Sequence, residues 1–183
     1  MQRKDTSEVI QALNNIGTNF RRLGIMDEAS NYHYRALSLC ERLGDKESYK
    51  ARKNRTISLS GIGNVYLTLE NCEMADSIFR IALEEERTLD SDLGLAMNYA
   101  NLGSIFEMRG MMDSAFVYYN YSMEHNRAAG SVVGISLCHN HIGRLFVKKG
   151  QWDQAIREYR NAYDLMVRSE EHTSELQSQR DIS

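Results

Sequence analysis

The sequence predicts an all-α fold made of four consecutive pairs of antiparallel helices. Three observations lead to this prediction. A glycine-centred segment occurs four times along the 183 residues. Apolar residues around each copy recur at steps of three and four, which is typical of one face of a helix. The chain also holds 12 glycines and no proline, so we expect its turns to rely on glycines that end helices in a left-handed conformation.

The four copies of the segment predict the first helix of each pair. They read NNIGTNFRRLG, SGIGNVYLTLE, ANLGSIFEMRG and NHIGRLFVKKG, with central glycines at Gly17, Gly63, Gly103 and Gly143. The first interval between these glycines is 46 residues, and the next two are 40 residues each. An aliphatic residue precedes each glycine, and an aromatic residue stands three positions after it: Phe20, Tyr66, Phe106 and Phe146.

The second helix of each pair follows in the same register. Twelve residues after each central glycine comes an alanine, and four residues later come His33, Phe79, Tyr119 and Tyr159. The glycine and alanine positions are small, as expected where two helix backbones pass closely, since a larger side chain would push them apart. The first helix is expected to end at Gly24, Gly110 and Gly150. The second is expected to be capped by the carboxylates of Asp27, Asp113 and Asp153.

This pattern resembles the tetratricopeptide repeat, whose signature is an aliphatic residue and glycine, then an aromatic residue, an alanine and a second aromatic residue. The resemblance implies an α-α superhelix of four repeats, at residues 6–43, 46–88, 92–129 and 132–167. The period exceeds the usual one of about 34 residues, which implies longer helices. The family's proline at the end of the second helix is replaced by Glu41, Arg87, Arg127 and Val167. The six extra residues before the second central glycine either lengthen the first helix of that repeat or form a longer loop.

Residues 168–183 do not continue the repeat. Written as codons, Arg168–Ser178 match the text of a widely used short-read sequencing adapter. We therefore expect 168–183 to be a non-native tail, and 1–167 to be a fragment of a longer protein. The last helix of the fourth repeat supports this expectation, because nothing follows to cover its apolar stripe of Ile156, Tyr159, Ala162, Tyr163 and Met166.

Composition excludes several classes of protein. The formal net charge of −3 lacks the basic excess of a nucleic-acid-binding protein, so we expect no nucleic-acid partner. No window of about 18 uncharged apolar residues is present, which excludes a transmembrane helix in this sequence. The three cysteines, Cys40, Cys72 and Cys138, are odd in number and far apart, so we expect buried thiols rather than disulfides or a zinc site.

No motif in the sequence indicates catalysis or a cofactor. It has no P-loop and no nucleophile elbow, so we expect neither an enzyme nor a metal protein. Cys138 and His141 share a helix face, but two ligands do not make a metal site. His139 falls at a packing position of the repeat, and His33 is expected in the core or at its boundary. The run EEER at 84–87 is expected on a solvated outer face, with an acidic docking site as the alternative.

The resemblance also implies a binding surface, because the first helices of tetratricopeptide arrays line a concave groove that takes a peptide or helix from a partner. Asparagine and serine in such a groove can both donate to and accept from a peptide backbone, and arginine can bind a carboxylate. The alternative is that these residues are merely solvated. The set of residues that clamps a C-terminal carboxylate in chaperone-binding members is absent. The candidate groove residues are Asn14, Thr18, Arg21, Asn64, Thr68, Asn101, Ser104, Glu107, Asn140, Arg144 and Lys148.

The sequence thus predicts a non-catalytic scaffold that binds a protein or peptide in its concave groove. Long-period repeats of this kind resemble the sensor regions of bacterial signalling proteins, and the alternative is a free-standing adaptor of a multiprotein assembly. The compartment stays open: the fragment alone fits the cytoplasm, whereas a sensor region could be periplasmic. Exposed apolar end faces would favour self-association.

Overall fold

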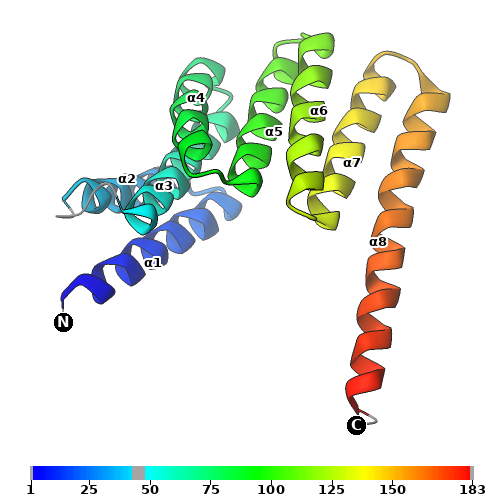
Figure 1. Cartoon of the computed structure of the whole chain (residues 1–183). Coiled ribbons are helices and arrows are strands. Elements are labelled where there is room, and N and C mark those ends of the chain that lie inside the picture. The colour runs from blue at the N-terminus through cyan, green and yellow to red at the C-terminus, as the bar shows by residue number, and fades with distance from the viewer. Residues whose placement is uncertain (1, 43–47, 182–183) are drawn as a thin grey trace.

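The all-α prediction is confirmed by the computed structural model, which describes the backbone of residues 2–42 and 48–181 and the side chains of residues 6–42 and 48–170. Over these residues the helices pair in an antiparallel fashion and stack into a curved array with α1 and α8 at its two ends (Figure 1). In chain order the helices are α1 (Gln2–Arg22), α2 (Met26–Arg42), α3 (Tyr49–Thr68), α4 (Cys72–Thr88), α5 (Asp92–Met108), α6 (Met112–Ala128), α7 (Val132–Lys148) and α8 (Trp152–Asp181).

Contacts between the helices define an inner and an outer layer. Each helix packs against the helices before and after it in the chain, and α1 also touches α3, α3 touches α5, and α5 touches α7. Within the described residues the even helices do not touch one another in this way. The odd helices therefore lie closer together, on the inside of the curve, and the even helices lie on the outside.

The central glycines make room for rings from the second helix of each pair. Each faces the ring sixteen residues further on, namely His33, Phe79, Tyr119 or Tyr159. A Cβ atom added at Gly103 would lie only 2.7 Å from Cδ1 of Tyr119. The expected close passage is therefore present, but it is a ring rather than a helix backbone that approaches the glycine.

Two of the hydrophobic core clusters cross repeat boundaries. Phe79 on α4 and Leu102 on α5 are fully buried in one cluster, and Tyr119 on α6 and Leu145 on α7 are fully buried in the next. Each outer helix thus packs on the inner helix of the following repeat as well as on its own partner. This arrangement explains why single repeats are not stable alone.

The turns that join the two helices of a repeat follow the glycine prediction, except in the second repeat. Gly24, Gly110 and Gly150 have φ of 78°, 73° and 70°, the left-handed conformation expected after a helix end. In the second repeat Glu70 adopts the same conformation, with φ of 58°. A residue with a Cβ atom is disfavoured there. Asp90, in the turn between α4 and α5, likewise has a positive φ of 50°.

The predicted aspartates lie inside the first turns rather than at the N-cap positions: Asp27 in α2, Asp113 in α6 and Asp153 in α8. At α6 the N-cap residue is Met111, which makes no capping hydrogen bond with its side chain. A carboxylate in the first turn still favours the positive end of the helix dipole. Side-chain caps are found instead at α4, through Asn71, and on inner helices, through Ser48, Ser91 and Ser131.

The extra residues before the second repeat do lengthen its inner helix. Helix α3 has 20 residues, whereas α5 and α7 have 17 each. The remaining extra residues precede Tyr49, and positions 43–47 lie outside the described residues.

The prediction of a solvated outer face at 84–87 holds for Glu84 and Arg87, which are exposed, but not for the whole run. Glu85 is half-buried, and Glu86 is only 3% exposed. Its carboxylate lies 3.0 Å from Nζ of Lys53 and beneath Gly94, where a Cβ atom would lie 2.1 Å from it. Glu86 therefore joins α4 to both neighbouring inner helices.

Helix α8 continues through residue 168, and Figure 1 shows it extending past the end of α7. Its predicted apolar stripe is uncovered in part: Ile156, Tyr159 and Tyr163 are 53%, 39% and 68% exposed, whereas Met166 is half-buried and Ala162 is buried. The last residues of the predicted tail, 182–183, and the side chains after residue 170 lie outside the described part of the structure. Within the described part, no helix has the length and apolar character needed to cross a bilayer.

Candidate peptide-binding groove

Exposed apolar side chains line the inner layer at equivalent positions of successive repeats. Met97 on α5 and Leu137 on α7 each stand six residues before a central glycine, and Ile57 is their equivalent on α3. One turn earlier, Leu93 and Val133 share their face. The exposed fractions of these five side chains range from 42% for Ile57 to 59% for Met97. We call these residues the inner apolar patch.

The patch opens into a cavity between α3 and α5. The cavity has a volume of about 420 Å³ and includes Ile57, Leu93 and Met97 among its lining residues, together with the exposed ring of Tyr49. Lys53, Ser60 and Asn98 add polar groups to its wall. Concave apolar surface with a few polar groups is the usual character of a binding site.

The predicted groove residues lie on the inner helices but differ in exposure. Asn14 and Glu107 are buried, at 3% and 5% exposed. Thr68, Asn140, Arg144 and Lys148 are exposed, and the others are half-buried: Thr18, Arg21, Asn64, Asn101 and Ser104. Choosing groove residues by their polarity therefore picked both buried residues and surface residues.

Asn14 belongs to a buried polar chain rather than to the open surface. Its Oδ1 lies 3.0 Å from Nδ1 of His33, and its Nδ2 donates to Oγ of Ser58 at 3.0 Å. These bonds join α1, α2 and α3. The Asn14 side chain therefore holds the first two repeats together.

Four of the predicted residues meet between α5 and α7 around Glu107. Its carboxylate accepts hydrogen bonds from Nε and Nη2 of Arg144, each at 2.7 Å, and pairs with Nζ of Lys148 at 2.7 Å. The hydroxyl of Tyr119 donates to it at 2.8 Å and also lies 3.2 Å from Oγ of Ser104. The inner surface thus carries a fixed cluster of charge next to the apolar patch.

Electrostatics keep this cluster ionised. Burial favours the neutral form of Glu107, but hydrogen bonds from Arg144, Lys148 and Tyr119 outweigh it and lower its pKa to about 2. Burial, and next the charge of Arg144, lowers the pKa of His141, whose ring stacks on Tyr119 with centroids 4.7 Å apart. His141 is therefore neutral at pH 7 and adds no charge.

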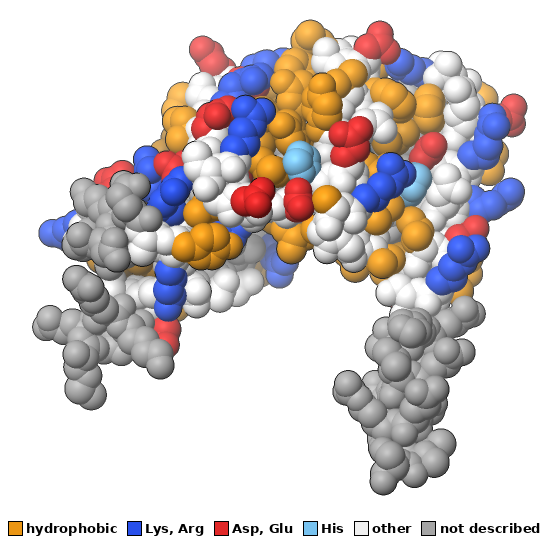
Figure 2. Space-filling model, in the orientation of Figure 1, with side chains coloured by type: hydrophobic (Ala, Val, Ile, Leu, Met, Phe, Trp, Pro, Cys, Tyr) orange, Lys and Arg blue, Asp and Glu red, His pale blue; other side chains and the backbone are white. Residues whose placement is uncertain are grey.

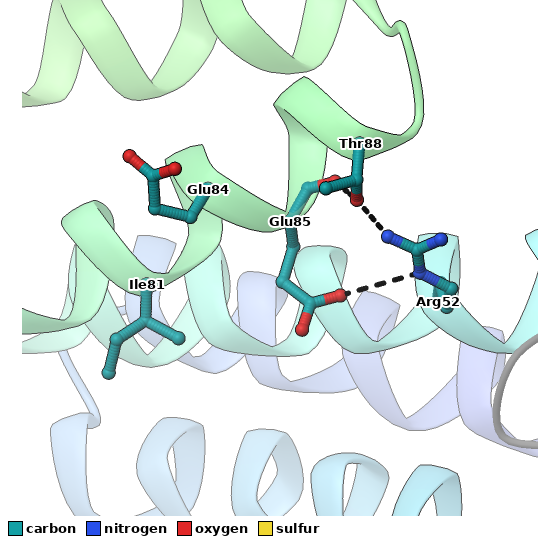
Figure 3. A pocket seen from close by; sticks show the side chains of 5 residues that line it. All are labelled: Arg52, Ile81, Glu84, Glu85 and Thr88. Atoms are coloured by element: carbon teal, nitrogen blue, oxygen red, sulfur yellow. Dashed lines mark hydrogen bonds and ion pairs between the residues drawn. The ribbon is translucent and has the colours of Figure 1, made fainter.

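A second depression lies at the junction of α3 and α4, and Figure 3 shows Arg52 bonded to Glu85 and Thr88 within it. Arg52 donates to the hydroxyl of Thr88 and pairs with Glu85 at 3.8 Å. Arg55 also pairs with Glu85. These groups fasten α3 to α4 and leave Ile81 and Glu84 as the other lining residues, so the depression offers little to a ligand.

The cysteine and histidine cluster on α7 is engaged in packing. Cys138 is buried, with its sulfur 3.3 Å from Oγ of Ser122. His139 pairs with Glu158 on α8 at 2.6 Å. Burial raises the pKa of the Cys138 thiol, so the thiol is neutral and a poor nucleophile at neutral pH.

Comparison with known proteins shows which proteins share this helical architecture. The family model described as "Tetratricopeptide repeat" matches residues 138–173. The TPR domain of FLU from Arabidopsis has a TM-score of 0.58 and 21% identity, over 63% of this chain and 97% of that one. The chain therefore has the fold of a tetratricopeptide array, and the family model itself covers residues 138–173. No curated protein matches its sequence.

Longer proteins share the fold of this tetratricopeptide array. BtubC from P. vanneervenii has a TM-score of 0.73 and 18% identity, over 93% of this chain and 68% of that one. The Rap conjugation gene regulator of plasmid pLS20, solved in complex with the Phr* peptide, has a TM-score of 0.79 and 18% identity, over 91% of this chain. The array spans 44% of that regulator's length. Likeness at this level of identity shows the fold.

Sequence reasoning missed the inner apolar patch, although a signal was present. Ile57, Met97 and Leu137 are apolar residues that recur at one position of the repeat, and the groove prediction considered polar residues alone. Figure 2 shows acidic, basic and apolar side chains interspersed on the face in view, with no single charge sign covering it. The surface feature that sets this molecule apart is therefore the inner apolar patch, not a charged face.

Proposed function

We propose that this tetratricopeptide array is a non-catalytic scaffold that binds a peptide or partner helix against its inner layer. The observation that carries the proposal is the inner apolar patch, where Ile57, Met97 and Leu137 stay exposed at the same position of three repeats. Exposed apolar residues that cluster on a concave surface favour interaction with a partner. Half-exposed Asn101 and exposed Asn140 supply groups suited to a peptide backbone.

The proposal is tested by charging the patch. Met97→Glu and Leu137→Glu should each weaken binding of peptides selected from a displayed random library by about tenfold or more, because each places a charge in an apolar contact. Val117→Glu on the outer helix α6 is the matched control, since Val117 is 46% exposed. Affinities are measured by calorimetry. Binding that tolerates both patch variants but is lost in the control would place the site on the outer layer instead.

The sensor and adaptor settings both remain proposals and differ in what would follow residue 167 in the source gene. Long-read sequencing across that codon separates them. An apolar segment of about 20 residues followed by an output domain would support the sensor, and a polar capping helix followed by a stop codon would support the adaptor. Genomic confirmation of the residues after 167 would overturn the adapter interpretation of the tail.

A further inference from the structure

The charge cluster between α5 and α7 does not balance internally. Glu107 supplies one negative charge, whereas Arg144 and Lys148 supply two positive charges. Glu107 is 5% exposed at its side chain, but those of Arg144 and Lys148 are 44% and 43% exposed. The buried carboxylate thus anchors two cations whose other sides face solvent, and one positive charge is left over.

Neighbouring groups do not cancel this charge. Among the described residues, Glu107 is the carboxylate that lies within ion-pair distance of Arg144 and Lys148. Asp113 pairs with Lys149 instead. The bonds to Glu107 use Nε and Nη2 of Arg144, and Nη2 also approaches Nδ1 of His141 at 3.0 Å. The other terminal nitrogen, Nη1, therefore has no partner within the described residues and remains available as a donor.

The cations lie at a fixed position relative to the inner apolar patch. Leu137 and Arg144 are seven residues apart on α7, so they lie two turns apart on nearly the same face, at about 10 Å along the axis. An extended peptide covers that distance in about three residues. A peptide whose apolar side chain contacts Leu137 can therefore bring a carboxylate to Arg144 and Lys148.

We propose that the inner groove selects partner peptides that carry an aspartate or glutamate about three residues from an apolar side chain, with the carboxylate bound by Arg144 and Lys148. This inference rests on the proposed function. The internal bonds to Glu107 fix the geometry of Arg144 in advance, which lowers the entropy cost of binding a ligand. A side-chain carboxylate is the occupant to which this proposal commits, because the spacing to Leu137 positions an acidic side chain within a chain that runs along α7.

The test uses the full chain and a displayed library of short random peptides, each fused at both ends so that no free carboxyl terminus is present. Selected peptides are expected to be enriched in Asp or Glu next to an apolar residue. Lys148→Gln and Arg144→Gln should each weaken an acidic binder about tenfold, and the binder with Asp→Asn should be insensitive to both changes. Lys149→Gln removes the same charge one residue away and should leave affinity unchanged. Wild-type affinity should fall with added salt, and less steeply in Lys148→Gln.

The outcomes separate the two proposals. If selected peptides depend on Met97 and Leu137 but show no acidic enrichment and no response to Lys148→Gln, the charge selectivity is wrong and the groove proposal stands. If Met97→Glu does not weaken any selected peptide, the groove proposal fails. If the fused peptides do not respond to Arg144→Gln but the same peptides synthesised with a free C-terminus do, the assigned source of the carboxylate is wrong. Lys148→Gln retains both bonds from Arg144 to Glu107, and an unchanged urea unfolding curve of this variant shows that loss of folding does not account for its effect.

Discussion

At the scale of single residues, His33 is the position where this array departs most from its own pattern. It stands where the other repeats have Phe79, Tyr119 and Tyr159, and it is 1% exposed. Because Asn14 accepts through Oδ1, Nδ1 of His33 must donate, which leaves Nε2 as an acceptor. Nε2 has no partner among the described residues. The first repeat therefore contains a buried polar ring where an apolar one would fit.

His33 predicts an acid-sensitive fold. Burial, and next the charge of Arg21, lowers its pKa from 6.5 to about 4. Between these values the unfolded chain binds a proton that the folded chain does not, so stability is full above pH 6.5 and falls as the pH drops towards 4. The expected loss is on the order of 3 kcal/mol.

Urea unfolding at a series of pH values measures this effect. His33→Phe should flatten the curve between pH 6.5 and 4 relative to the wild type, because phenylalanine cannot bind the proton. Acidic groups that are common to both chains cancel in the difference between the two curves. Equal slopes in the two chains would show that His33 is not the source of the acid sensitivity.

At the scale of helices, the glycine register controls how the pairs fit. We predict that Gly103→Ala destabilises the fold by about 1–3 kcal/mol, because its Cβ atom would lie 2.7 Å from the buried ring of Tyr119. Gly→Ala within a helix ordinarily gains about 1 kcal/mol, so a net loss identifies the steric conflict. Glu124→Ala on the exposed face of α6 is the control and should stay within about 0.5 kcal/mol. A stabilised Gly103→Ala variant would show that the pair can separate freely.

Helix positions could be predicted from sequence because apolar spacing, glycines and repeat register all agreed. Helix caps were harder to predict, since Asp113 is one of several acidic residues near a helix start and only the backbone decides which residue precedes the first turn. Burial of polar residues was harder still. Glu86 and Glu107 resemble surface residues in sequence, yet each is buried because basic residues from a neighbouring inner helix, Lys53 and Arg144, reach it.

At the scale of the whole molecule, each helix packs mainly against the helices next to it in the array. This arrangement predicts which truncations the fold tolerates. A chain that ends at Val167 should keep its unfolding free energy within about 0.5 kcal/mol, because Ala155, Tyr159 and Ala162 make the contacts of α8 with the core. This tests our proposal that 1–167 is the repeat domain and 168–183 a non-native tail. Calorimetric and urea unfolding of both chains gives the comparison.

A second truncation gives the loss of stability expected when a whole helix of the fold is removed. Ending the chain at Lys149 removes α8 and uncovers Gly143 and its surroundings on α7, so we expect a loss of more than about 3 kcal/mol. If the chain ending at Val167 loses as much, then residues 168–183 belong to the fold and the proposed boundary is wrong.

The sequence by itself determined the all-α class, the four repeats, the glycine turns and the aromatic positions, because each of these depends on local spacing that the chain repeats. Only the tertiary structure decided which polar residues are buried and which surface is left for a partner. The reason is physical: burial of Asn14, Glu86 and Glu107 depends on groups that lie 19 to 44 residues away in the chain. The inner apolar patch likewise exists because the curve of the array brings α3, α5 and α7 side by side.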